Sequence, residues 1–141
     1  MRRWIGLMAL GTAVLLLGAA CSSSSDEEKG ATITINGDKA NDHGTKDVSG
    51  NSFELEADND GSDFYFDPTT LKGSPGAKVT LTVGNEGDVK HNFTLEDQGV
   101  DEDVDAGEDV EVTVTFPQSG TLEFYCKYHR TQGMVGQLQA S

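Results

Sequence analysis

The stretch VEVTVTF at residues 110–116 shows most clearly which kind of fold this sequence makes. Valine or phenylalanine alternates along it with a charged residue or threonine, which is the period of a β-strand with one buried and one solvated face. The stretch KVTLTV at residues 78–83 alternates in the same way and places Val79, Leu81 and Val83 on one face. Both stretches predict strands of a sheet that packs one side on a hydrophobic core.

Shorter apolar or aromatic stretches surround these two and are separated by turns rich in Asp, Asn, Gly and Pro. The further predicted strands are FELEA at 53–57, FYF at 64–66, HNFTL at 91–95, LEFYC at 122–126 and MVGQL at 134–138. After residue 20 no helix-length pattern with a 3.6-residue period occurs, and no internal repeat. Many short strands at this spacing predict an all-β sandwich or barrel.

Composition narrows the classes of protein to consider. The chain has 141 residues, 10 Lys and Arg against 24 Asp and Glu, a formal net charge of −14, and 2 cysteines. This length suits one domain with short extensions and excludes a multidomain enzyme. The negative charge excludes nucleic acid as a partner, because phosphate binding needs clustered cations. Two cysteines exclude a disulfide-dense scaffold and any four-cysteine metal cluster.

The first 20 residues have the pattern of a bacterial lipoprotein signal peptide. A basic start, MRRW, precedes an uncharged apolar run over residues 5–20, which is too short and too rich in glycine for a membrane-spanning helix. The sequence LGAAC at 17–21, followed by serines, resembles a lipoprotein processing site, although Gly18 stands where leucine is usual. The resemblance implies that Cys21 carries the fatty acyl chains, including palmitate, whereas in an ordinary signal peptide Cys21 would be incidental. Both interpretations predict an extracytoplasmic protein, and the first predicts one anchored to the cell membrane.

Residues 21–51 are expected to form a polar tether between this anchor and the domain. Residues 22–30, SSSSDEEKG, are polar and without periodicity, and only a brief alternation at 32–35 suggests a short strand. The globular domain is predicted over residues 52–141. Removal of residues 1–20 would leave 121 residues with a formal charge of −16.

Four residues in the predicted domain carry metal-binding chemistry. Cys126, His129 and Met134 form a C-x2-H-x4-M pattern, and His91 lies 35 residues before Cys126. A thiolate and two imidazoles can form a trigonal plane that a thioether caps at longer range, which is the ligand set of a blue-copper site. Structural zinc would require more Cys or His ligands, and a soft thioether selects copper. A metal ion would also explain the unpaired Cys126, since metallation protects the thiolate.

The stretches FYFDP at 64–68, GDVKHNF at 87–93 and FYCKYHRTQGMVG at 124–136 resemble those of cupredoxins of the plastocyanin and azurin group. This resemblance covers residues 52–141 and implies a Greek-key β-sandwich with one type 1 copper ion at one end. It implies His91, Cys126 and His129 as equatorial ligands, Met134 as the axial ligand, and Asn92 as a brace for the ligand loop. It further implies that His129 lies nearest the surface, in an apolar patch with Gly133 and Val135, where electrons leave.

These features predict a membrane-anchored one-electron carrier that cycles between Cu(I) and Cu(II), with no enzymatic activity. Four protein ligands leave no open position for a substrate, and a catalytic Cys126–His129 pair would leave His91 and Met134 unexplained. The partners would be redox proteins of the cytochrome or oxidase type, and the acidic surface favours partners with cationic patches. The alternative is copper delivery outside the cytoplasm, although delivery sites are usually open or rich in Met and His.

Two further signals receive no function. The acidic stretch that starts at Asp101 suggests a calcium-binding EF-hand loop, which requires glycine at its sixth position and glutamate at its twelfth. Ala106 and Val112 occupy these positions, so the calcium site is excluded. This stretch is therefore expected to be a solvated acidic loop. His43, outside the other patterns, is left unassigned.

Overall fold

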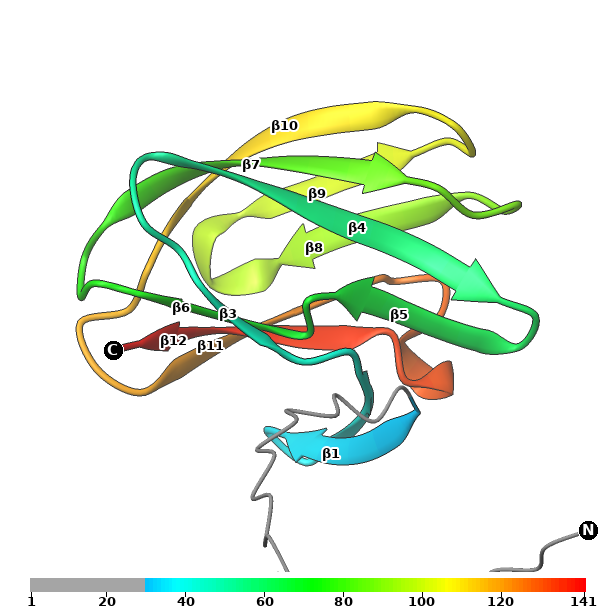
Figure 1. Ribbon diagram of the computed structural model, residues 1–141, viewed down its shortest axis with the longest axis horizontal. Helices are drawn as coiled ribbons and strands as arrows, with labels where there is room; N and C mark the ends of the chain where they lie inside the picture. Colours follow the sequence, from blue (N-terminus) through cyan, green and yellow to red (C-terminus); the bar gives the residue numbers. More distant parts are fainter. Residues whose placement is uncertain (1–29) are drawn as a thin grey trace, which may run out of the picture.

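The computed structural model describes residues 30–141, which form a sandwich of two β-sheets with a hairpin added to one side (Figure 1). A four-stranded sheet has the order β10-β7-β4-β5, and a six-stranded sheet has the order β3-β6-β12-β11-β8-β9. The strands are β1 (Ala31–Ile35), β2 (Asp38–Asp42), β3 (Thr45–Asp47), β4 (Ser52–Asp60), β5 (Asp63–Asp67), β6 (Thr70–Gly73), β7 (Lys78–Asn85), β8 (His91–Leu95), β9 (Val100–Val104), β10 (Asp109–Thr115), β11 (Thr121–Tyr125) and β12 (Val135–Ala140). Two 3-10 turns, η1 (Glu96–Gln98) and η2 (Arg130–Gln132), are the helical elements of the described part.

The predicted all-β fold class is confirmed. Parallel pairs, such as β4 with β7 and β6 with β12, occur beside antiparallel ones because the chain crosses repeatedly from one sheet to the other. The two alternating stretches that indicated the fold pair directly, with Val112 opposite Leu81 and Val114 opposite Val79. Among residues 30–141, no helix has the length and apolar character needed to cross a bilayer.

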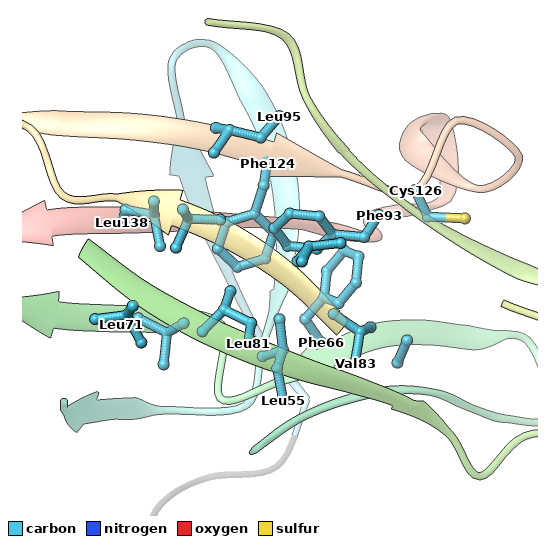
Figure 2. Packing of buried hydrophobic residues seen from close by; sticks show 14 of the residues in the cluster. Leu55, Phe66, Leu71, Leu81, Val83, Phe93, Leu95, Phe124, Cys126 and Leu138 are labelled. Carbon is cyan, nitrogen blue, oxygen red and sulfur yellow. The ribbon is translucent and has the colours of Figure 1, made fainter. Parts of the chain in front are cut away.

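The core lies between the two sheets and is built around three phenylalanines (Figure 2). The ring centroids of Phe66 and Phe124 are 5.1 Å apart, and those of Phe93 and Phe124 are 5.0 Å apart. Burying each such ring stabilises the fold by about 1.5–3 kcal/mol. Figure 2 shows Cys126 at one end of this cluster, so the packed core fixes the position of the thiol.

The short strand suggested at residues 32–35 is present as β1, but the tether predicted around it is wrong, because β2 and β3 follow within residues 38–47. β1 and β2 make a hairpin whose two-residue turn, Asn36-Gly37, has positive φ at both positions, 48° and 96°. The hairpin buries Ile35 and Ala40 outside the main core, and β3 adds to the edge of the six-stranded sheet through β6. The predicted signal peptide (1–20) and Cys21 lie outside the described residues.

The expected acidic loop after residue 100 is also corrected. Residues Val100–Val104 form β9, an edge strand paired with β8. Val104 is buried, whereas Asp101, Glu102 and Asp103 are exposed. Charged side chains on an edge strand discourage pairing with another chain, and they hid the strand from an analysis of hydrophobic pattern.

Candidate metal centre

The strands bring three of the four predicted ligands to one point. His91 is the first residue of β8, Cys126 directly follows β11, and His129 lies in the loop after it. Their potential ligand atoms all lie within 4.8 Å of one another, and Cys126 Sγ is 3.5 Å from His129 Nδ1. His91 and Cys126 are completely buried, whereas His129 is half-buried. The site is therefore closed on the core side and open only at His129.

Backbone hydrogen bonds fold residues 126–134, here called the ligand loop, into a compact turn. The carbonyl of Cys126 accepts the N–H of His129 at 3.1 Å, and the carbonyl of His129 accepts those of Gln132 and Met134 at 2.9 and 3.2 Å. The carbonyl of Met134 accepts the N–H of Cys126 at 3.0 Å. The loop thus returns the chain so that Met134, itself fully buried, lies beside Cys126 in the backbone pairing.

Asn92 connects the start of the ligand loop to β8 and β9. Its Oδ1 accepts the backbone N–H of Lys127 at 3.2 Å and the hydroxyl of Thr94 at 2.6 Å. Its Nδ2 donates to the carboxylates of Asp101 at 2.8 Å and Asp103 at 3.1 Å on β9. Every polar atom of this buried amide has a partner, so the position of Lys127, and with it that of Cys126, is tightly restrained.

Burial sets the protonation of the three side chains. It raises the pKa of the Cys126 thiol, and backbone N–H groups directed at the sulfur oppose this effect. It lowers the pKa of His91 to about 4, with help from His129, and also lowers the pKa of His129. Near neutral pH both imidazoles are therefore uncharged, which is the form that binds metals, and a metal at Cys126 would displace a proton from the thiol.

A metal ion fits these residues. Both ring nitrogens of His91 are buried and have no hydrogen-bond partner among the described residues. Unpartnered buried nitrogens are costly, and an ion bound to one of them would remove part of that cost. One thiol sulfur and two imidazole nitrogens form a soft donor set, and buried Met134 is hydrogen-bonded to Cys126 through the backbone. Such donors favour copper over calcium or magnesium.

Phe64 on β5 covers the imidazoles, a role that the sequence did not indicate. Its ring stacks on His129 with centroids 4.0 Å apart and planes 9° from parallel, and it meets His91 edge-on at 6.2 Å. The stretch that contains Phe64 predicts a strand and contributes to the resemblance to cupredoxins, but it assigns no contact to this ring. Because the neighbouring residues in β5 are also aromatic, nothing local distinguishes the ring that packs on the predicted ligand His129.

The apolar patch expected at Gly133 and Val135 is wrong, since both residues are buried. The β1–β2 hairpin covers them: Ile35 and Ala40 pack in one cluster with Val135. Within residues 30–141 the large hydrophobic side chains that are exposed are Val89 and Tyr128, at 39% and 45%. Each lies within two residues of a predicted ligand, and the ring of Tyr128 is 6.4 Å from that of His129.

Comparison with known proteins assigns the family. The profile of the family described as "Cupredoxin-like domain" matches residues 7–138. The chain belongs to the cupredoxin-like family. The cofactor expected for this cupredoxin, copper, follows from the family, and His91, Cys126 and His129 form one candidate site for it.

Three known proteins are similar to this chain, one in sequence and two in fold. The cupredoxin is 29% identical to plastocyanin A/B of Petroselinum crispum over 97 residues, which cover 60% of this chain and 96% of the plastocyanin. Auracyanin A, a "blue" copper protein of Chloroflexus aurantiacus, has a TM-score of 0.53 and 23% identity, and the match covers 68% of this chain and all of auracyanin A. The metal-binding domain of the Cu(I)-exporting P-type ATPase CopA of Streptococcus pneumoniae D39 has a TM-score of 0.52 and 13% identity, and the match covers 70% of this chain and 97% of that domain. The two structural likenesses show the fold.

Proposed function

We propose that this cupredoxin is a one-electron carrier with a single type 1 copper ion, held by His91, Cys126, His129 and Met134. The observation that supports this proposal most directly is the convergence of one thiol and two imidazoles within 4.8 Å at the buried end of a rigid sandwich. Copper, when bound, would supply a Cu(I)/Cu(II) couple. The likeness to auracyanin A, a "blue" copper protein, supports the proposed type of copper site.

The residues around the site favour electron transfer over catalysis. Cys126 and His91 are excluded from water, and Asn92 and the backbone pairing hold the ligand loop in place. A preformed site changes little between oxidation states, which favours rapid electron exchange. Four protein ligands would leave no position for a substrate, so the proposed carrier has no enzymatic activity.

Electrons would enter and leave through the half-buried edge of His129, beside the ring of Tyr128. The nearby charges are locally paired: Lys127 Nζ lies 2.9 Å from Asp101 and 3.0 Å from Asp103, and Lys90 Nζ lies 3.0 Å from Asp105. A redox partner, such as a cytochrome or an oxidase, could contact this area without desolvating unpaired charges. The acidic remainder of the protein would attract a partner with cationic patches.

The second candidate is copper delivery outside the cytoplasm. The observation that favours it is the partial exposure of His129, where an acceptor could approach the ion. Against it, the other grouped donors are fully buried, and Met134 is the only methionine after residue 20. A delivery site exchanges its ion readily, whereas burial slows such exchange.

Loading the purified protein with Cu(II) tests the proposal. We expect an intense blue thiolate-to-copper band and a reversible one-electron couple, with slow loss of copper to a chelating acceptor. Cys126→Ser should abolish the band, because the serine oxygen cannot replace the thiolate sulfur, whereas Cys21→Ser should leave it unchanged. Colourless binding, or rapid loss of copper to the chelator, would instead support delivery.

We also propose that acyl chains on Cys21 attach the protein to the outer face of the cell membrane. The support is the sequence pattern at residues 17–25. Fractionation of cells expressing the full chain should find it with membranes, and Cys21→Ser should release it or block its processing. A protein that remains soluble with Cys21 intact would contradict the anchor.

A further inference from the structure

The β1–β2 hairpin, expected to be part of a flexible tether, is fitted against the ligand loop. Ile35 and Ala40 form a separate apolar cluster with Tyr125 and Val135. Tyr125 directly precedes Cys126, and Val135 directly follows Met134, so the hairpin packs on both ends of the ligand loop. Figure 1 shows the hairpin on the outer side of the six-stranded sheet, next to the loop that precedes β12.

One guanidinium joins the hairpin to the ligand loop. Arg130, adjacent to His129, donates from Nε to Asp38 on β2 at 2.7 Å and from Nη2 to Glu123 on β11 at 2.6 Å. Its guanidinium carbon also lies 3.9 Å from the centroid of the Tyr125 ring. A planar cation shared by two carboxylates and an aromatic face fixes orientation better than an isolated surface pair would.

Asn41 on β2 makes the central contacts. Its Nδ2 donates to the carbonyl of Phe64 at 2.9 Å and to that of Gln132 at 3.0 Å, and its backbone N–H donates to the carbonyl of Gly133 at 2.9 Å. Phe64 is the residue whose ring stacks on His129. One amide therefore fixes both the aromatic cover of His129 and the segment that connects His129 to Met134.

His43, to which the sequence assigned no function, fixes the end of the hairpin. His43 is buried and stacks on Tyr65, with centroids 3.5 Å apart and planes 8° from parallel. Its backbone N–H donates to Thr69 Oγ1 at 2.7 Å, and the Thr69 hydroxyl donates to the carbonyl of Asn41 at 3.0 Å. These contacts hold Asn41 in register with β5 and the ligand loop.

We propose that the β1–β2 hairpin is a structural part of the metal centre, and that Asn41 is its positioning residue. Asn41 holds residues 129–134 in the conformation that places His129 and Met134, in the way that partners of metal ligands orient those ligands. The proposal rests on the proposed function only in the tests that use the copper-loaded protein. Its first test needs no metal.

In the metal-free protein, loosening of the ligand loop is measurable directly. Asn41→Ala removes two hydrogen bonds to the loop and its cover, so amide hydrogen exchange in residues 132–134 should accelerate about tenfold or more. Alkylation of buried Cys126, separated from Cys21 by peptide mapping, should accelerate similarly. Asn41→Asp keeps the shape but lacks the N–H donors, and it should behave like Asn41→Ala.

Gln98→Ala is the matched control. The Gln98 amide also makes two hydrogen bonds to backbone, both to Thr115, the last residue of β10, and neither involves the ligand loop. Its loss should leave exchange at 132–134 and alkylation of Cys126 unchanged. The milder Asp38→Asn, which weakens only the contact with Arg130, should accelerate both processes to a smaller extent. The proposal is overturned if both Asn41 variants behave like Gln98→Ala.

With copper bound, a positioning role predicts changes that general loss of stability would not cause. Asn41→Ala should shift the thiolate-to-copper band and the reduction potential, while Gln98→Ala should leave both as in the wild type. Equal spectra and potentials in the two variants would overturn the positioning role. If the wild type has no blue band, the proposed function fails, but the metal-free measurements still decide whether the hairpin holds the loop.

Discussion

Replacing Gly133 with alanine tests how closely the hairpin fits the ligand loop. Gly133 has a φ of +97°, and an L-residue in such a conformation costs about 1–3 kcal/mol. A Cβ at this position would lie 2.6 Å from Asn41 Oδ1 and 2.7 Å from Asn41 Cγ. Displacing the packed amide would cost about 1–3 kcal/mol more. The free energy of unfolding should therefore fall by about 2–6 kcal/mol, the sum of these two effects.

Urea unfolding of the metal-free protein separates the two effects. Gly50 also has a φ of +97°, but a Cβ there would meet nothing within 4 Å, so Gly50→Ala should show the conformational cost alone. In the Asn41→Ala/Gly133→Ala double mutant the clashing atoms are gone, and the combined loss should be at least about 1 kcal/mol smaller than the sum of the single losses. Strict additivity, or equal losses for Gly133→Ala and Gly50→Ala, would refute the close fit.

Two further predictions concern the axial position and alkaline stability. Met134→Gln should retain copper but lower the reduction potential, because the axial ligand tunes it; voltammetry that finds an unchanged potential would contradict the axial assignment. Burial, with Asp58 next to it, raises the pKa of Tyr65 to about 12. The Tyr65 hydroxyl therefore loses its proton at a lower pH in the unfolded chain than in the folded protein. The free energy of unfolding should fall as the pH rises from about 10 to about 12. Urea unfolding should show a smaller fall for Tyr65→Phe, and an identical fall would show that Tyr65 is not responsible.

Local patterns in the sequence were enough to predict most strands. β7 and β10 have one buried and one solvated face, so their alternation is complete within each strand. β9 was missed because its middle residues, Asp101, Glu102 and Asp103, are all exposed. An edge strand has neighbours on one side only, and its hydrophobic signal is correspondingly weak.

Local sequence also predicted most of the candidate metal centre. Cys126, His129 and Met134 lie within nine residues, and a single loop is enough to bring their backbone positions together. His91 required the pairing of β8 with β11, which the sequence does not specify, but its residue type completes the set of soft donors. The residue types therefore predicted the candidate ligands, and the structure supplied the distances among His91, Cys126 and His129.

The β1–β2 hairpin and Phe64, which cover the site, could not be predicted, because their contacts join distant parts of the chain. Ile35 and Ala40 are too few to predict a buried hairpin, because their partners Tyr125 and Val135 lie about ninety residues away. Local periodicity determined the sandwich, short spacing determined three of the candidate ligands, and residue type alone indicated His91. Only the tertiary structure decided that the hairpin covers the ligand loop and that Phe64 packs on His129, because both contacts join segments whose sequences contain no signal of each other.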